Sequence, residues 1–255
     1  RFSLIAGGGY FDGEDTYDAT LELESLGLPP DTLKEESNPR HTNLYTYALI
    51  DLPSNATMTL GGSDNSFDGP PKDKDQFNPK FGMSWEMTPS TNLRIAGFRV
   101  LKRQIVSSQT MEPTHVAGFQ QFFDDPNATD SKRFGVALDQ RLATNLFGGL
   151  ELSKRDVGVP VTSLTQGIKE VNVDERLDRA YLYWTSNRWV SASAEYQVEQ
   201  SDSDDTTLPF SQKVKTKRVP FGLKVYHPNG FLIKLKATFL EQEGMFEDTS
   251  FNYFS

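Results

Sequence analysis

The chain has 255 residues, a net charge of −9 and no cysteine, and 36% of its residues are hydrophobic, with a mean hydropathy of −0.52. This composition excludes disulfide bridges, cysteine-based zinc sites and thiol nucleophiles, and the acidic balance argues against a nucleic-acid partner. No apolar run reaches the roughly 18 residues of a membrane helix, whereas a β-barrel, in which half of each strand faces water, is compatible with the low mean hydropathy.

The first third of the sequence predicts strands separated by polar segments. Residues 2–11 have a strand-like, glycine-rich sequence, and we expect residues 12–39 to form a long loop in which TYDATLELE could form a small hairpin. A clearer hairpin follows, with the strands RHTNLYTYALIDL and TMTLGGSDNSF on either side of the turn PSNA.

Residues 77–103 carry the strongest pattern in the chain. Apolar side chains alternate with polar ones and glycine, which is the two-residue period of a strand, before the turn formers of residues 88–92 and a second strand through Leu93 and Ile95. The apolar set is Phe81, Met83, Trp85 and Met87, and the other set is Lys80, Gly82, Ser84 and Glu86. An apolar face of this kind packs on a second sheet in a soluble sandwich and contacts lipid in a membrane barrel.

Further hairpins are predicted after a long irregular segment. We expect residues 104–131 to form a loop that would be unusual inside a compact soluble domain, and residues 158–173 to form another long connection. The predicted hairpins pair KRFGVALDQRL with LFGGLELSKRDV, RLDRAYLYWTS with RWVSASAEYQVEQ, and KRVPFGLKVY with FLIKLKATFLEQ. FNYFS indicates the start of another strand. Because an open edge is costly in lipid, we expect residues 1–255 to be a single incomplete barrel domain that further strands close.

Short and long connections alternate along the chain, which is the arrangement of outer-membrane barrels. The short turns are expected near residues 53–56, 88–92, 143–145, 186–188 and 227–230, and the long links near 67–76, 104–131, 158–173, 201–214 and 243–250. All three tryptophans, Trp85, Trp184 and Trp189, lie within a few residues of short turns, where an interfacial aromatic girdle is expected.

Several motifs resemble the barrel region of bacterial outer-membrane proteins related to TonB-dependent receptors, including proteins that carry tetratricopeptide repeats upstream. They are RHTNLYTYALIDLP, QFNPKFGMSWEMTPSTNLRIAGFRVLKR, EPTHVAGFQQFFDD, RFGVALDQRL, GGLELSKRDVGVP, ERLDRAYLYWTS, SAEYQVEQ and HPNGFLIKLKATFLEQEG. The resemblance runs from about Arg40 to Gly244 and implies an outer-membrane location and traffic across that membrane. The 255 residues contain neither a recognisable plug domain or TonB-contacting segment nor a helical repeat, so energised uptake cannot be argued from them.

Alternation also predicts which charged side chains face inward, and two interpretations of them remain open. In one, a charged lumen binds or filters a polar solute; in the other, which we favour, opposite charges pair across a solvated wall. The mixed signs argue against a strongly selective pore. The lumen-facing candidates are Lys80, Glu86, Arg94, Arg133, Asp139, Arg141, Glu151, Arg155, Glu195, Lys224, Lys234 and Lys236.

Recognition is expected in residues 104–131, where Phe119, Phe122 and Phe123 lie in an otherwise polar segment. Their partner is either the barrel itself, if the loop folds inward, or a neighbouring protein. We expect the scattered His41, His115 and His227 to be surface residues and predict no metal site. The aspartates at 124, 125 and 130, and those at 202, 204 and 205, could bind calcium, but solvated acidic loops are favoured.

No catalytic residue and no cofactor is predicted, because GGGYFDG lacks the lysine of a phosphate loop and no serine–histidine or acidic pair lies in a recognisable frame. The expected fold is an all-β, antiparallel transmembrane barrel of about eleven to thirteen strands, built as a meander of long hairpins. Its expected function is passage of a polar solute or polymer across the bacterial outer membrane. The alternative is a non-transporting anchor or scaffold whose loops bind a partner; a soluble sandwich is the third option. Expected partners are outer-membrane lipid, an envelope protein, or an upstream repeat or plug domain.

Overall fold

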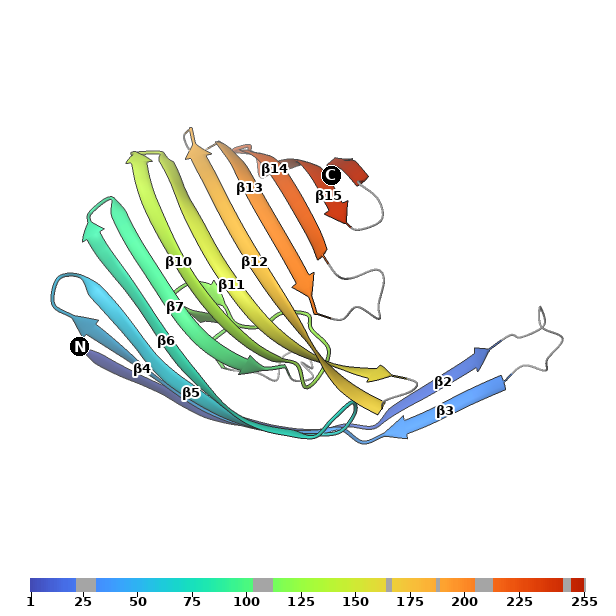
Figure 1. Ribbon diagram of the computed structural model, residues 1–255. Coiled ribbons are helices and arrows are strands. Elements are labelled where there is room, and N and C mark those ends of the chain that lie inside the picture. The colour runs from blue at the N-terminus through green and yellow to red at the C-terminus, as the bar shows by residue number, and fades with distance from the viewer. Residues whose placement is uncertain are drawn as a thin grey trace.

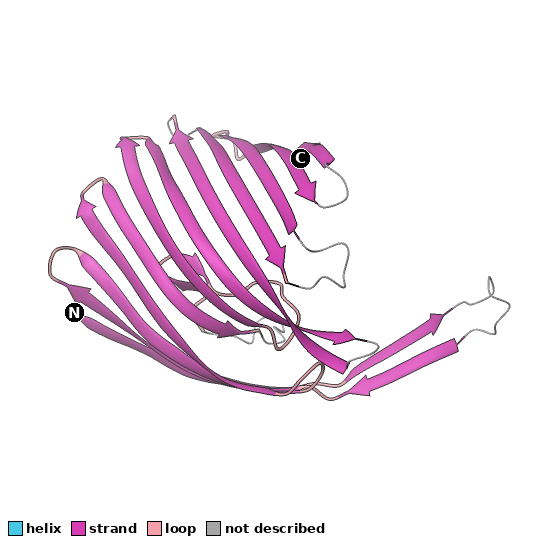
Figure 2. Ribbon diagram, viewed as in Figure 1, coloured by secondary structure: helices cyan, strands magenta, loops and turns pink. Residues whose placement is uncertain are grey.

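The described chain is built from antiparallel strands (Figure 1, Figure 2). The structure is a computed structural model and describes residues 1–21, 31–102, 112–163, 167–186, 189–204, 213–244 and 249–254. Over these residues a 12-stranded sheet has the order β1-β4-β5-β6-β7-β10-β11-β12-β13-β14-β15-β16. The strands are β1 (Phe2–Asp12), β2 (Asp15–Leu21), β3 (Asp31–Ser37), β4 (Arg40–Leu52), β5 (Ala56–Asp68), β6 (Lys74–Thr88), β7 (Thr91–Leu101), β8 (His115–Val116), β9 (Phe119–Gln120), β10 (Asp130–Ala143), β11 (Leu146–Ser163), β12 (Gly167–Thr185), β13 (Val190–Ser203), β14 (Lys213–Tyr226), β15 (Leu232–Gly244) and β16 (Thr249–Phe254).

The sheet is a curved meander of long hairpins, as the sequence predicts. Strands that follow one another along the chain pair side by side, apart from the inserted pairs β2–β3 and β8–β9. Most strands of the large sheet have 11 to 15 residues, and β11 and β12 have 18 and 19. Globular strands centre on about five or six residues, so these lengths suit a tilted membrane crossing. No helix long and apolar enough to cross a membrane occurs among the described residues.

Two expectations about connections need correction. Residues 12–39 are not simply a loop, because β2 and β3 pair from Asp15–Ser37 to Leu21–Asp31 as a ribbon that extends away from the large sheet (Figure 1). The expected long connection at 158–173 is mostly a continuous hairpin, since β11 and β12 stay paired as far as Ser163 and Gly167. The β2–β3 ribbon and the paired ends of β11 and β12 both continue past the neighbouring strands. The polar composition of these segments had indicated loops.

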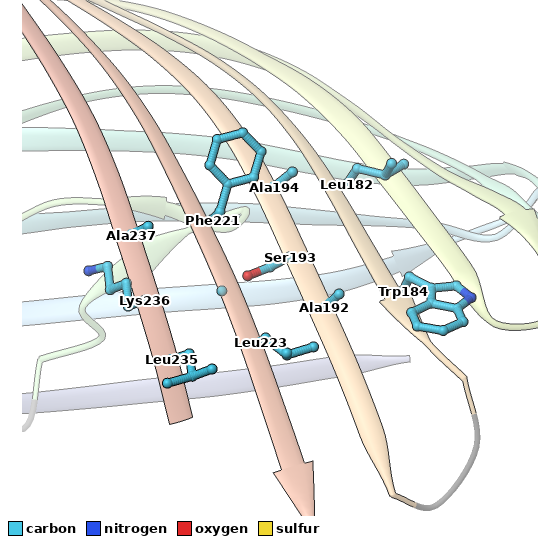
Figure 3. Close-up of a pocket in the computed structure, with 11 residues that line it drawn as sticks. Leu182, Trp184, Ala192, Ser193, Ala194, Phe221, Leu223, Leu235, Lys236 and Ala237 are labelled. Carbon is cyan, nitrogen blue, oxygen red and sulfur yellow. The ribbon is translucent and has the colours of Figure 1, made fainter. Parts of the chain in front are cut away.

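The convex face of the sheet is apolar over the half of each strand nearest the short turns. Leu150 is 57% exposed, and Leu138, its partner in register, is 40% exposed, because no element of the described chain covers either side chain. In the same belt, Ala192 and Ala194 lie in a hollow of about 760 Å³ that is also lined by the apolar residues Leu182, Trp184, Phe221, Leu223, Leu235 and Ala237 (Figure 3). An apolar face this extensive is the surface that a sheet turns toward acyl chains.

Charged side chains replace apolar ones on the same convex face toward the long-loop end. Lys154 lies 3.4 Å from Asp174, Arg176 lies 2.8 Å from Asp178, and Lys217 pairs with both Glu241 and Glu243. All these side chains lie on the same face of the sheet as Leu150. Side chains separated by an even number of residues on one strand share a face, and so do residues paired in register on neighbouring strands. The change from apolar to charged therefore marks one border of the membrane-facing belt.

The tryptophans lie at the short-turn edge, which is the other border of the belt. Trp85 donates its indole N–H to the carbonyl oxygen of Ser54 in the β4–β5 turn at 3.1 Å. Trp184 pairs with Leu146 and Ala192 in register, and the Trp189 carbonyl accepts a hydrogen bond from the Tyr226 amide next to the following turn. Trp184 and Trp189 are 39% and 38% exposed, so each presents an aromatic ring with a polar N–H at this edge.

A charge placed in the apolar belt tests whether this face contacts lipid. Leu150→Arg in the complete protein should reduce the free energy of folding into phosphatidylcholine vesicles by about 2–4 kcal/mol, because the guanidinium would replace an alkyl group near mid-membrane. Gln200→Arg, on the loop side of the border, is the matched control and should change it little. Urea titration of folding into vesicles measures both. Equal, small effects of the two variants would contradict the lipid-facing assignment.

Candidate functional site

Residues 112–129 fold back onto the concave face of the sheet, where β8 and β9 form a short hairpin (Figure 1). The hairpin reverses at Ala117 and Gly118, whose φ angles are +46° and +84°. Two successive positive φ angles define the two-residue turn whose twist matches paired strands. The turn sets Val116 opposite Phe119, and both side chains are almost completely buried.

Phe119 anchors this segment to the wall of the sheet. Its ring packs against Gly135 of β10, where an added Cβ would come within 2.7 Å of the ring carbon Cδ1. The guanidinium carbons of Arg94 and Arg133 lie 5.3 and 5.6 Å from the ring centre, within reach of a cation–π interaction. Val116 packs in the same way over Gly82. The glycines on the wall therefore make room for the two apolar side chains of the hairpin.

An apolar cluster beneath the segment was not predicted. It comprises Tyr45, Tyr47, Ala96, Phe98, Val100, Val116, Phe119 and Ala137, with Ala117 and Phe122 packed against it. A charged inner face is predicted for the 77–103 hairpin, and this prediction is wrong for the loop-side half of β7, where Ala96, Phe98 and Val100 face inward. The signal was present, since residues 95–101 are apolar on both faces apart from Gly97 and Arg99, as in a strand that is covered on both sides.

A buried ion pair fixes the start of the segment. Lys80 Nζ lies 3.3 Å from Glu112 Oε1, and the two side chains are only 1% and 2% exposed. Tyr47 donates its hydroxyl hydrogen to the same carboxylate at 2.7 Å, and Lys80 also donates to Gln121 Oε1. A buried pair of charges persists when its remaining hydrogen-bonding groups are satisfied, as they are here. Glu112 and Gln121 were not among the predicted site residues, because nothing local in the sequence reveals that they meet Lys80.

A second ionic contact fixes the far end. Arg155 of β11 makes a bidentate contact with Asp125, with Nη–Oδ distances of 2.7 and 3.0 Å, and its Nε donates to Glu175 at 2.8 Å. Phe123 lies between Arg155 and Arg133, at 4.0 and 5.2 Å from the two guanidinium carbons. Planar guanidinium groups suit both the carboxylate and the aromatic ring.

The remaining wall is a ladder of paired charges that runs from β7 to β13. Arg94 contacts Asp139 at 2.6 Å and Glu151 at 3.7 Å, and Arg133 contacts Glu151 at 3.5 Å. Further along, Arg179 of β12 contacts Glu195 of β13 at 2.9 Å. Tyr181 donates to Asp139 and Tyr183 to Glu195, so both tyrosine hydroxyls link the ladder across strands. The two-residue alternation that predicts an inward-facing Glu195 also predicts that Arg179, Tyr181 and Tyr183 of β12 face inward.

Five of the predicted inward residues lie outside both this ladder and the ionic contacts of the folded segment. Glu86 and Arg141 are exposed near the short-turn edge, where the Arg141 guanidinium carbon lies 5.4 Å from the centre of the Phe147 ring. Lys224, Lys234 and Lys236 are exposed on β14 and β15. The structure thus brings together Arg94, Arg133, Asp139, Glu151, Arg155 and Glu195, places Lys80 beneath the folded segment, and leaves these five apart from both groups.

The three phenylalanines proposed for recognition all contact the sheet. Phe119 and Phe123 pack against wall arginines, and Phe122 packs against the apolar cluster. Of the two partners left open by the sequence, the barrel wall is the one seen in the structure.

The expectation that all three histidines are surface residues was wrong for His41. Its ring is 4% exposed and forms a 3.1 Å hydrogen bond with Asn65, whereas His115 and His227 are exposed. The described part of the chain contains no group of three metal-ligating side chains. Two of the aspartates considered for calcium form ion pairs instead: Asp125 with Arg155, and Asp130 with Arg99.

One comparison with a solved structure supports the barrel fold. The chain is similar to FpvAI in its complex with pyocin S2, at 11% identity and a TM-score of 0.50, over 88% of this chain and 36% of that one. It is also similar to a NanC porin, at 10% identity and a TM-score of 0.41 over 85% of this chain and 90% of that one, and to a mutant of the Rh. blastica porin, at 10% identity and a TM-score of 0.27 over 100% and 98%. No family model and no curated protein matches the sequence.

The fold is an antiparallel transmembrane β-barrel. Together with the exposed apolar belt, it places the chain in the bacterial outer membrane.

Removing the Phe119 ring should loosen the folded segment. Phe119→Ala is expected to reduce the free energy that holds residues 112–129 on the wall by about 3 kcal/mol, because it leaves a cavity against Gly135. Amide hydrogen exchange in that segment should become roughly a hundredfold faster. Phe134→Ala removes an equal ring from the convex face and should leave this exchange unchanged. Unaltered protection in the Phe119 variant would show that other contacts hold the segment.

Breaking the buried ion pair should have a similar effect through a different cause. Glu112→Gln leaves the Lys80 ammonium without its buried counter-charge, a change that typically costs about 3–5 kcal/mol. We expect faster proteolytic cleavage within residues 112–129, and partial recovery when both partners are replaced in Lys80→Met with Glu112→Leu. Glu36→Gln, which breaks an exposed pair with Lys34, should not alter the cleavage rate. Equal rates for wild type and the Glu112 variant would contradict the anchoring role.

Proposed function

We propose that the chain is the wall of an outer-membrane passage for a polar solute or polymer, narrowed by residues 112–129. The observation that carries the proposal is the folded segment itself, which is fixed at both ends to the concave face by Glu112–Lys80 and Asp125–Arg155. A segment held in this way reduces the cross-section enclosed by a curved sheet, and it does so at a defined position.

The chemistry of the two faces supports passage of polar molecules. The convex face is apolar, whereas the concave face between the folded segment and the short turns carries carboxylates, guanidinium groups and tyrosine hydroxyls. Most of these groups are only half-buried, so they are available to replace water around a polar solute. The paired charges also leave the ladder without a dominant sign.

The relation to TonB-dependent receptors and to barrels with tetratricopeptide repeats belongs to the same proposal. It rests on the sequence motifs between Arg40 and Gly244, and it would make a plug or repeat domain the first partner to seek in the complete protein. Uptake and export are both compatible with the wall described above. Outer-membrane lipid is the proposed partner of the convex face.

A scaffold without transport is the second candidate function, and one observation favours it. The β2–β3 ribbon and the paired ends of β11 and β12 extend past the neighbouring strands at the long-loop edge (Figure 1). Extended ribbons with free edges can accept a strand from another protein. In that case the folded segment would close the lumen, and the ribbons would present the binding surface.

Removing the folded segment separates the two candidates. If the chain lines a passage, replacing residues 113–128 with a short glycine–serine linker should raise single-channel conductance of the complete protein in planar bilayers several-fold, because the obstruction is gone. Deletion of residues 16–36 removes the β2–β3 ribbon outside the wall and is the control that should leave conductance unchanged. A lumen that stays closed after removal of the segment would count against passage and favour the scaffold.

A further inference from the structure

Lys224, Lys234 and Lys236 form a group of positive charges on the concave face of β14 and β15. Lys224 lies directly opposite Lys234 in the register, and Lys236, two residues further along β15, lies opposite Gly222. All three side chains are exposed, and within the described residues none forms an ion pair or a hydrogen bond. Among the described residues, therefore, no carboxylate neutralises the positive charge that the three lysines place on this small area of the wall.

Most of the other inward cations differ from this group; Arg141, which has no ion pair among the described residues, contacts the ring of Phe147. Lys80, Arg94, Arg133 and Arg155 each have a carboxylate oxygen within 4.0 Å, and Arg218, on the same face of β14, lies 3.3 Å from Glu199. Like charges directly opposite each other on neighbouring strands are destabilising. The pairing of Lys224 with Lys234 thus has a cost that a bound anion would remove.

Small polar residues lie beside the lysines on the same face. Ser191 of β13 is opposite Lys224, and Ser193 is opposite Gly222. An ideal Cβ at Gly222 would meet the Ser193 hydroxyl oxygen at 2.6 Å, so the glycine keeps the space above that hydroxyl open. Ammonium and hydroxyl groups that converge on an open area supply the donors that phosphate, sulfate and carboxylate groups accept.

Glu195 is the acidic residue of the concave face that lies nearest in sequence to Ser193, and its carboxylate forms hydrogen bonds with β12. Glu195, two residues beyond Ser193, accepts hydrogen bonds from Arg179 and Tyr183 at 2.9 and 2.6 Å. Its charge is therefore directed toward the ladder on β12.

We propose that Lys224, Lys234 and Lys236, with the hydroxyls of Ser191 and Ser193, form a binding site for the oxyanion group of a polar solute. The proposal deepens the proposed passage function, on which it rests for the route of the solute. It assigns that solute a class, a molecule bearing phosphate, sulfate or carboxylate, and it places the site on β13–β15, toward the short-turn edge.

Binding is tested first without any requirement for transport. Inorganic phosphate is titrated calorimetrically into the complete protein in zwitterionic detergent at low ionic strength, so that no anionic lipid headgroup competes. The variant K224Q/K234Q/K236Q should bind phosphate at least about tenfold more weakly than wild type, because three charge-assisted contacts are lost. The control K132Q/K154Q/K213Q removes the same charge from the convex face and should bind like wild type.

Two results of the titration would overturn the site: phosphate affinity equal in wild type and the first variant, or an equal loss in both variants, which would reveal attraction by net charge alone. Circular dichroism and resistance to unfolding by detergent at room temperature verify that each variant is folded. A misfolded triple variant is replaced by the single variant K234Q, which should still weaken binding because it removes the central ammonium.

Conductance then separates this proposal from the passage function. In a KCl gradient across a phosphatidylcholine bilayer, the reversal potential of the lysine variant should shift toward cation preference relative to wild type and to the convex-face control. A wild-type protein that binds phosphate without conducting would overturn the passage function and leave the site in place. A wild-type protein that conducts without binding phosphate would overturn the site alone.

Discussion

The constraint on which this structure depends is the separation of two solvents by one layer of sheet. Inside the sheet, each strand donates and accepts its backbone hydrogen bonds laterally, so lipid need not satisfy the peptide groups between paired strands, and side chains alone decide what each face meets. Because successive side chains point to opposite faces, the same strand can offer Leu150 to acyl chains and Glu151 to water. The length of the strands, the position of the tryptophans and the charged border on the convex face are consistent with that separation.

The concave face combines two kinds of interaction that are energetically different. Under residues 112–129 the contacts are buried: an apolar cluster, the Lys80–Glu112 pair and the rings stacked on arginines. Removing any one of them leaves a cavity or a bare charge. Along β12 and β13 the pairs are half-exposed, and pairs of that kind contribute little stability individually. The first set therefore determines where the segment lies, whereas the second determines which solutes the wall can accommodate.

Pairing changes how the charges of this wall should be interpreted. The predicted inward residues include both signs, eight positive and four negative, and this mixture argued against a selective pore. In the structure the carboxylates are neighbours of arginines, so most of the charge cancels within a few ångströms, whereas Lys224, Lys234 and Lys236 have no such neighbour among the described residues. The spatial distribution of the charges, and not their sum, carries the functional information.

The sequence by itself determined the fold class, the antiparallel meander, the short turns and the apolar–polar alternation, because each depends on contacts between residues close in the chain or on a period of two. Only the tertiary structure decided that residues 112–129 lie on the wall, that Glu112 meets Lys80, that His41 is buried, and that β11 and β12 stay paired through residues expected to be a loop. Apart from the β11–β12 hairpin, these features join segments distant in sequence. The position of residues 112–129 on the wall depends on space at Gly82 and Gly135 and on burial of charge, neither of which a local pattern records.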